Sequence, residues 1–191
     1  MRAQAILGLY AQGLFPMDEP GATRLPWWVA DPRTLFELDA RSRAAVRRRV
    51  RRSLRAGACW DLRLDVAFDA VIDACACPRA AGDGVWLTPR MKALYRVLRA
   101  AGHAHTFELW ADGELAAGLI AVTMGRAAML ESMFHRVPHA GNVLLSRTLD
   151  ALAGGGCLLC DIQTPTDHTL RLGAVQVPRA EYEARLRSAL G

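Results

Sequence analysis

Residues 127–163 read AAMLESMFHRVPHAGNVLLSRTLDALAGGGCLLCDIQ, and this stretch decides the fold. Its first part, residues 127–134, alternates in the manner of a strand. Leucines at helical spacing follow, and three consecutive glycines at 154–156 end the predicted helix. The last part, residues 158–163, alternates again. A strand, a helix and a second strand predict a right-handed crossover between parallel strands.

Each predicted strand carries a carboxylate in an otherwise apolar run. Period-two alternation places Met129, Glu131 and Met133 on one face of the first strand. It places Asp161 and Gln163 on one face of the second. Such groups are costly to bury without partners. If the two strands are neighbours, Glu131 and Asp161 approach each other across a cleft and define a candidate site. The alternative is a strand end whose polar residues meet solvent.

The length and composition bound the class of protein. A chain of 191 residues can form one core with a small accessory lobe. No run of 18 apolar residues is present, which excludes a spanning helix. The N-terminus shows no signal-peptide pattern, so we expect a cytoplasmic protein with no membrane contact. Five cysteines, an odd number, fit reduced thiols better than a disulfide framework.

The positive charge is concentrated in one segment. The net charge is +5, and eight arginines fall between residues 41 and 55 with no acidic residue among them. On a helix these side chains would repel one another unless a polyanion neutralised them, which favours contact with a nucleic acid backbone. The alternative is a solvated basic helix. The arginines expected to contact the nucleic acid are Arg41, Arg43, Arg47, Arg48, Arg51, Arg52 and Arg55.

The remaining elements alternate between helices and strands. Asp112-Gly113 predicts a tight hairpin, and Thr88 followed by Pro89 predicts a helix start. The expected helices are residues 3–12, 41–55, 67–76, a segment from Pro89 to Gly102 and a segment after Pro178; the expected strands are residues 62–66, 106–110, 114–124 and 175–177. This order predicts an α/β (α+β) protein with a mixed sheet.

The order resembles the GNAT acyltransferase fold. We expect a small N-terminal lobe over residues 1–39 and a GNAT-like domain over residues 40–191. In acetyl-CoA users of this fold, a glycine-rich loop before the crossover helix binds pyrophosphate. Here Pro138 removes a backbone donor from that loop and His139 replaces its central glycine. The damaged loop indicates an acyl donor other than CoA.

Short motifs in order along nearly the whole chain resemble the leucyl/phenylalanyl-tRNA–protein transferase family. The matching segments are Tyr10–Pro16, Trp27-Trp28 with Asp31-Pro-Arg33, Trp86–Thr88, Gly102–His105, Glu131–Phe134, Asp161–Gln163, and Asp167-His168 with Leu172–Ala174. The resemblance implies transfer of leucine or phenylalanine from charged tRNA to proteins that begin with arginine or lysine, which marks them for degradation. The donor amino acid stays open. The resemblance also implies that no metal and no CoA or other cofactor takes part, and we expect a monomer.

The resemblance also implies roles for particular residues. Asp161 and Gln163 would act as a catalytic relay, in which Gln163 accepts a hydrogen bond from the attacking amine and Asp161 orients and polarises it. Glu131 would hold the basic residue of the acceptor or its amine. The implied substrate-binding residues are Glu131, Trp28, Trp86 and Met133, the last three forming a wall for the adenosine and the apolar side chain.

Two other classes of function remain open on the residues alone. One is a CoA-dependent GNAT acyltransferase acting on small amines. The other is a non-enzymatic RNA-binding module, which explains the arginine segment but not the combination of Glu131, Asp161 and Gln163.

Overall fold

The computed structural model describes residues 2–19, 21–56, 59–78 and 87–191. The helices are α1 (Ala3–Tyr10), α2 (Ala40–Arg49), α3 (Arg51–Leu54), α4 (Phe68–Cys75), α5 (Pro89–Ala100), α6 (Ala140–Gly154), α7 (Asp167–Leu172) and α8 (Arg179–Leu190). The strands are β1 (Phe15–Pro16), β2 (Trp27–Trp28), β3 (Arg33–Phe36), β4 (Trp60–Leu64), β5 (Ala104–Ala111), β6 (Glu114–Met124), β7 (Ala127–His135), β8 (Leu159–Asp161) and β9 (Val175–Val177).

A mixed sheet organises the chain. Among the described residues its strand order is β4-β5-β6-β7-β8-β3-β9, and β1 pairs with β2 in a separate small ladder. The strands β4 to β7 form an antiparallel meander. The pair β7–β8 is parallel, and β3 lies antiparallel between β8 and β9. The predicted parallel crossover is therefore confirmed, as is the mixed sheet.

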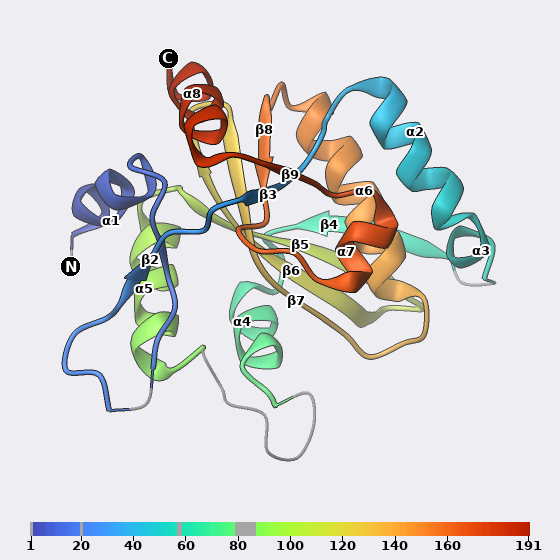
Figure 1. The fold of residues 1–191 in the computed structure, drawn as a ribbon. Helices are drawn as coiled ribbons and strands as arrows, with labels where there is room; N and C mark the ends of the chain where they lie inside the picture. The colour runs from blue at the N-terminus through green and yellow to red at the C-terminus, as the bar shows by residue number, and fades with distance from the viewer. Residues whose placement is uncertain (1, 20, 57–58, 79–86) are drawn as a thin grey trace.

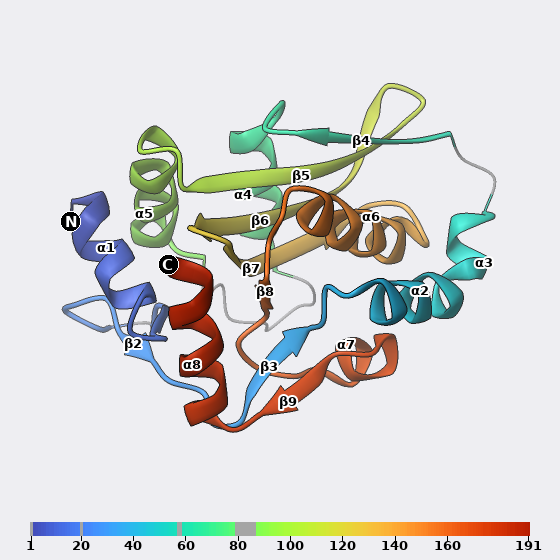
Figure 2. The ribbon, with the colours of Figure 1, turned by 90° about the horizontal axis from the view of Figure 1, so that it is seen from above.

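Helices cover both faces of this sheet (Figures 1 and 2). One core lies between the sheet and α1, α4, α5 and α8, and it contains Tyr10, Tyr95 and Tyr182. The other core lies on the side of α2, α6 and α7 and contains Val46 and Leu144. The sheet thus separates two apolar layers, and the face that a strand residue points to decides which layer it meets.

Local signals account for most element boundaries. The Thr88 side chain accepts a hydrogen bond from Met91 N at the start of α5, whose first residue is a proline. Asp112 and Gly113 have φ values of 51° and 85°, as a tight hairpin turn requires. The basic segment is helical as expected, but it divides at Val50 into α2 and α3. Val46 and Val50 pack into the core beneath it.

Four of the described elements were not predicted from the sequence: the strands β1, β2 and β3 and the helix α7. The four residues of β3 were not expected as a strand, although Asp31-Pro-Arg33 was noted as a motif. The helix α7 has six residues, and its signal is a capping box between Thr166 and Thr169. The division into a lobe of residues 1–39 and a domain of residues 40–191 stays a prediction; β3, which precedes residue 40, belongs to the main sheet.

No helix within the described ranges has both the length and the apolar character that crossing a membrane requires. The cysteines are free thiols in the structure.

Candidate active site

The site lies where β7 and β8 separate. These strands pair only from Ala127 to Met129 and from Leu159 to Asp161. Beyond that point β7 continues to His135 while β8 ends, so the two chains form a fork. Met129 lies opposite Asp161 in the register, and Glu131 follows two residues later. The two strands are neighbours, as the cleft hypothesis required.

Glu131 lies at a β-bulge. Ala121 pairs with Leu130 and the preceding Ile120 pairs with Ser132, so Glu131 has no partner residue on β6. Because a bulge inserts one extra residue into the strand, the side chains that follow it point to the opposite face from the one that simple alternation predicts. Glu131 points to the layer of α1 and α5, whereas Met133 packs against the layer of α6. The expectation that both share a face with Met129 was therefore wrong for Met133.

Two tyrosine hydroxyls hold the Glu131 carboxylate. Tyr10 donates to Oε1 and Tyr95 donates to Oε2, each at 2.9 Å. Burial raises the pKa of Glu131 from 4.5 to about 7, and the two hydrogen bonds offset part of this rise. Burial and the neighbouring carboxylate also raise the pKa of both tyrosines. Glu131 therefore changes protonation near neutral pH while its hydroxyl donors stay neutral.

Asp161 forms a buried ion pair with Arg33. The guanidinium donates from Nε to Oδ1 at 2.9 Å and from Nη2 to Oδ2 at 2.6 Å. Tyr182 donates to Oδ2 at 3.0 Å, and Gln163 N donates to Oδ1 at 2.8 Å. Although burial works against the charged guanidinium, the Asp161 carboxylate raises the pKa of Arg33 above its ordinary value. Both oxygens of Asp161 are therefore occupied by protein donors.

Gln163 leaves the strand geometry. Its φ of 58° lies in the left-handed region, and β8 has already ended at Asp161. With its amide nitrogen turned toward the fork, the side chain donates to Leu130 O at 3.1 Å and to Ile162 O at 3.0 Å. Asp161 and Gln163 are thus joined through the backbone of Gln163, not by the shared strand face that alternation predicted.

The two carboxylates face the same side of the sheet. Tyr182, which binds Asp161, belongs to the same core layer as the tyrosines that bind Glu131. The negative charge of Asp161 raises the pKa of Glu131, and the positive charge of Arg33 lowers it. The site is therefore one coupled network of acids, hydroxyls and a guanidinium.

The predicted wall residues are divided among different places. Trp28 is 39% exposed, and its indole Nε1 donates to Met17 O at 3.2 Å. Its neighbour Trp27 packs edge-on against Tyr10, with ring centroids 5.6 Å apart, and so lies closer to the network. Met133 lies on the opposite face, beside Gly141 at the start of α6. Trp86 lies outside the described residues.

The arginine segment contains paired and unpaired members. Arg43 and Arg47 both bind Asp150 Oδ1 on α6, at 2.6 Å and 2.5 Å. These two side chains anchor α2 to α6. Among the described residues, no ion pair or hydrogen bond occupies the side chains of Arg41, Arg48, Arg51, Arg52 and Arg55.

Sequence reasoning assigned no role to Arg33, Tyr10, Tyr95 or Tyr182. A usable signal existed for Arg33, because it is a charged residue at the start of the apolar run Thr-Leu-Phe. The tyrosines resemble ordinary core residues in the sequence. Their hydroxyls become informative only when the bulge places a carboxylate beside them.

Comparison with solved structures defines the fold class. The crystal structure of FemX matches with a TM-score of 0.60 at 11% identity, over 91% of this chain and 66% of that chain. This likeness and the strand order support the expected fold class, a GNAT-like mixed α/β sheet.

Sequence comparison gives the family. Residues 38–187 match the family model described as leucyl/phenylalanyl-tRNA protein transferase. The enzyme of that name from Nitratidesulfovibrio vulgaris is 41% identical, over 97% of this chain and 78% of the relative. The one from Nitrobacter winogradskyi is 39% identical, over 98% of this chain and 82% of the relative. The chain belongs to the leucyl/phenylalanyl-tRNA–protein transferase family and is a transferase of this type. This result favours the transferase over the CoA-dependent acyltransferase and the non-enzymatic RNA-binding module.

Proposed function

We propose that this chain transfers leucine or phenylalanine from charged tRNA to the α-amine of proteins that begin with arginine or lysine, which tags them for degradation. The observation that carries the acceptor assignment is the Glu131 carboxylate at the fork. It is a partly exposed acid held in a fixed orientation by two hydroxyls. One carboxylate opposite a guanidinium or ammonium forms a charge-assisted pair, which explains a preference for a basic first residue.

The chemistry requires a free amine next to an activated ester. An α-amine has a pKa near 8, so about nine-tenths of it is protonated at pH 7. In this proposal the ionised Glu131 first binds the basic acceptor. Because its pKa of about 7 lies close to that of the amine, it then accepts the amine proton without a large energetic penalty. The amine nitrogen then bonds to the ester carbonyl carbon and gives up a second proton. The ester C–O bond breaks, and the ribose oxygen of the tRNA end takes up this second proton and leaves as a hydroxyl. The proton held by Glu131 is released to solvent.

Asp161 and Gln163 act in this proposal as one positioning unit. Asp161 fixes Gln163 through its backbone N–H, and its charge is balanced by Arg33. The Gln163 amide nitrogen is used by the Leu130 carbonyl, so its oxygen is the group that accepts a hydrogen bond from the attacking amine. A neutral amide is a weak base, whereas good positioning can supply roughly 7–11 kcal/mol of the barrier. Gln163 therefore orients the amine, and Asp161 orients Gln163.

The donor approaches the fork from the other face of the sheet, the face covered by α6. Met133 and the start of α6 lie in the layer of the basic helices, so we assign the apolar side chain of the donor to that layer. The predicted contact of Trp28 and Trp86 with the adenosine stays a prediction: Trp28 lies in the β1–β2 ladder, away from the α6 layer, and Trp86 lies outside the described residues. Charged tRNA as donor also places the reaction in the cytoplasm, and the monomeric state stays a prediction.

The unpaired arginines bind the phosphate backbone of the tRNA. Replacing Arg48, Arg51 and Arg52 by alanine should weaken tRNA binding and reduce the slope of log affinity against log salt by about 2–3, because each phosphate contact contributes roughly 0.7–0.9. Replacing Arg43 should mainly loosen α2 from Asp150. An unchanged salt slope in the triple variant would remove these arginines from the tRNA site.

A transfer assay tests the catalytic proposal. The unmodified protein is incubated with leucyl-, phenylalanyl- or glutamyl-tRNA and a peptide that begins with arginine. We expect labelling with the first two donors and its loss in Glu131→Gln, with tRNA binding retained. The matched control is Glu114→Gln, an exposed glutamate in the β5–β6 hairpin, which should leave labelling unchanged. Full labelling by Glu131→Gln contradicts the role of this carboxylate, and no labelling by the unmodified protein contradicts the proposed function.

A further inference from the structure

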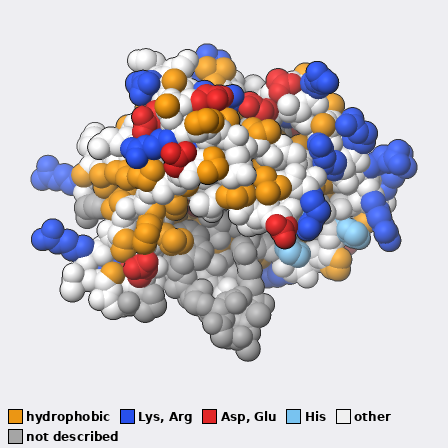
Figure 3. Space-filling view, viewed as in Figure 1, with side chains coloured by type: hydrophobic (Ala, Val, Ile, Leu, Met, Phe, Trp, Pro, Cys, Tyr) orange, Lys and Arg blue, Asp and Glu red, His pale blue; other side chains and the backbone are white. Residues whose placement is uncertain are grey.

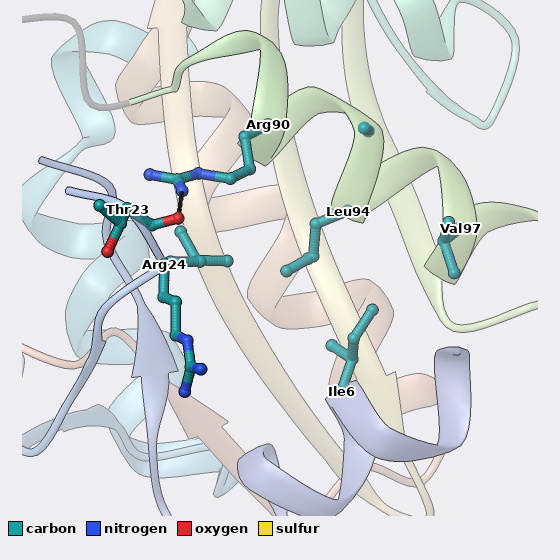
Figure 4. Close-up of a pocket in the computed structure, with 8 residues that line it drawn as sticks. Ile6, Thr23, Arg24, Arg90, Leu94 and Val97 are labelled. Atoms are coloured by element: carbon teal, nitrogen blue, oxygen red, sulfur yellow. Dashed lines mark hydrogen bonds between the residues drawn. The ribbon is translucent and has the colours of Figure 1, made fainter. Parts of the chain in front are cut away.

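A pocket lies beside the tyrosines that hold Glu131. It is a pocket of about 530 Å³ between α1, α5 and the segment before β2 (Figure 4). This volume lies in the range of pockets that bind small ligands. Its lining is mainly apolar, with two arginines among the lining residues. The residues used below are Ile6, Leu25, Leu94, Val97, Arg24 and Arg90.

The helices that line the pocket also form the Glu131 site. Ile6 lines the pocket, and Tyr10, four residues later on the same helix face, donates to Glu131. On α5, Leu94 lines the pocket and the adjacent Tyr95 donates to the other carboxylate oxygen. One turn of helix rises about 5.4 Å. The pocket is therefore one layer of side chains away from the carboxylate.

The two arginines of the pocket differ in their partners. Arg90 donates to the Asp18 carboxylate and to the backbone oxygens of Ala22 and Thr23. Among the described residues, no hydrogen bond or ion pair engages the Arg24 side chain, which extends away from Arg90 in Figure 4. Arg24 thus presents an uncompensated positive charge beside an apolar surface. An arginine beside an apolar pocket favours a ligand that carries an acidic group next to an apolar one.

The pocket and the arginine segment lie at opposite ends of the molecule. In Figure 1, α1 and α5 lie at the left and α2 and α3 at the right, and Figure 2 agrees. Figure 3 shows a dense group of Lys and Arg side chains at the right, and at the left a broad hydrophobic area with separate basic side chains around it. If the tRNA binds at the end with the arginine segment, the end with the pocket is available to the acceptor polypeptide.

We propose that this pocket binds apolar side chains of the acceptor polypeptide, within the few residues that follow its basic first residue, with an acidic neighbour favoured by Arg24. This inference rests on the proposed function, because it takes Glu131 as the site of the first residue. An extended chain advances about 3.3–3.6 Å per residue. We therefore expect the second to fourth residues of the acceptor to reach the pocket. The enzyme thus reads a short sequence, not the first residue alone.

Acceptor peptides with single changes test this inference. The series starts from Arg followed by glycines and places one leucine at position 2, 3 or 4, with aspartate or lysine as its neighbour. Transfer from phenylalanyl-tRNA gives kcat and KM, and fluorescence anisotropy of labelled peptides without tRNA gives binding. Burying one leucine should lower KM and Kd by about tenfold or more at one of these positions. Aspartate as the neighbour should be preferred over lysine.

Variants separate the pocket from the rest of the site. Ala93 lines the pocket from an exposed position on α5, so Ala93→Trp fills it without disturbing the core. We expect the leucine preference to fall below twofold in this variant. Arg24→Glu should reverse the preference between aspartate and lysine. The control is Arg187→Glu, an exposed arginine on α8, which should keep both preferences.

The outcomes distinguish the two proposals. If transfer occurs but neither leucine nor the pocket variants change KM or Kd, the pocket inference is overturned and the proposed function stands. If no transfer occurs but leucine peptides bind through the pocket, the proposed function fails, and peptide binding by the pocket is the part of the inference that is supported. If peptides neither bind nor accept an amino acid, both are overturned.

Discussion

Glu131→Gln should make the protein more stable at alkaline pH. The native state holds the Glu131 proton more tightly than the unfolded chain, because burial raises its pKa from 4.5 to about 7. A tenfold difference in proton affinity corresponds to about 1.4 kcal/mol, so the full difference is about 3 kcal/mol. Glu131 keeps some contact with solvent, which makes this value an upper limit.

The sign follows from proton linkage. With a raised native pKa, the stabilising contribution of the Glu131 proton is complete below about pH 4.5 and is lost as the pH rises to about 7. Glutamine is neutral at every pH, and its amide can accept a hydrogen bond from Tyr10 and donate one to Tyr95. The free energy of unfolding of Glu131→Gln minus that of the unmodified protein should therefore increase with pH, by up to about 3 kcal/mol.

Urea unfolding at a series of pH values from 5 to 8 measures this difference, since other titrating groups cancel between the two proteins. Glu114→Gln serves as the control and should give a constant difference. A flat difference for Glu131→Gln would show that the Glu131 carboxylate is not desolvated, and the assignment of its proton-accepting role would fall with it.

Three further changes probe the frame of the site. Asp161→Ala leaves the Arg33 guanidinium buried without its carboxylate partner and should lower the free energy of unfolding by about 3–5 kcal/mol. Urea unfolding measures this loss, and a loss below about 1 kcal/mol would contradict a buried pair. Gly118→Ala should cost about 1–3 kcal/mol, because a Cβ atom there would lie 2.6 Å from Phe134 Cε1, and unchanged stability would refute this close packing. Thr88→Ala removes the N-cap of α5 and should cost about 1 kcal/mol, seen as a lower thermal midpoint, whereas an unchanged midpoint would show that the cap is not needed.

Sequence patterns were most reliable where local chemistry acts alone. The hairpin at Asp112-Gly113, the helix start at Thr88 and the parallel crossover each depend on a few adjacent residues or on a strong period. The carboxylates Glu131 and Asp161 stood out because charge in an apolar run is unusual. Their proximity followed from the topology.

The parts that could not be predicted depend on register and on distant partners. The bulge at Glu131 turns Met133 to the other face of the sheet. No residue type in β7 indicates that its pairing with β6 shifts by one residue at this point. The partner of Asp161 lies 128 residues earlier in the chain. Arg33 could not be assigned to Asp161 before β3 was known to lie beside β8, and four residues are too few for a periodic signal.

The position of β3 has a consequence for the biosynthesis of this enzyme. The strand β3 fills the gap between β8 and β9, two strands that are synthesised long after it. Such long-range closure is slow compared with local folding. A nascent polypeptide that has not yet reached β8 therefore lacks the Arg33–Asp161 ion pair, and the site can form only after β8 has paired with β3.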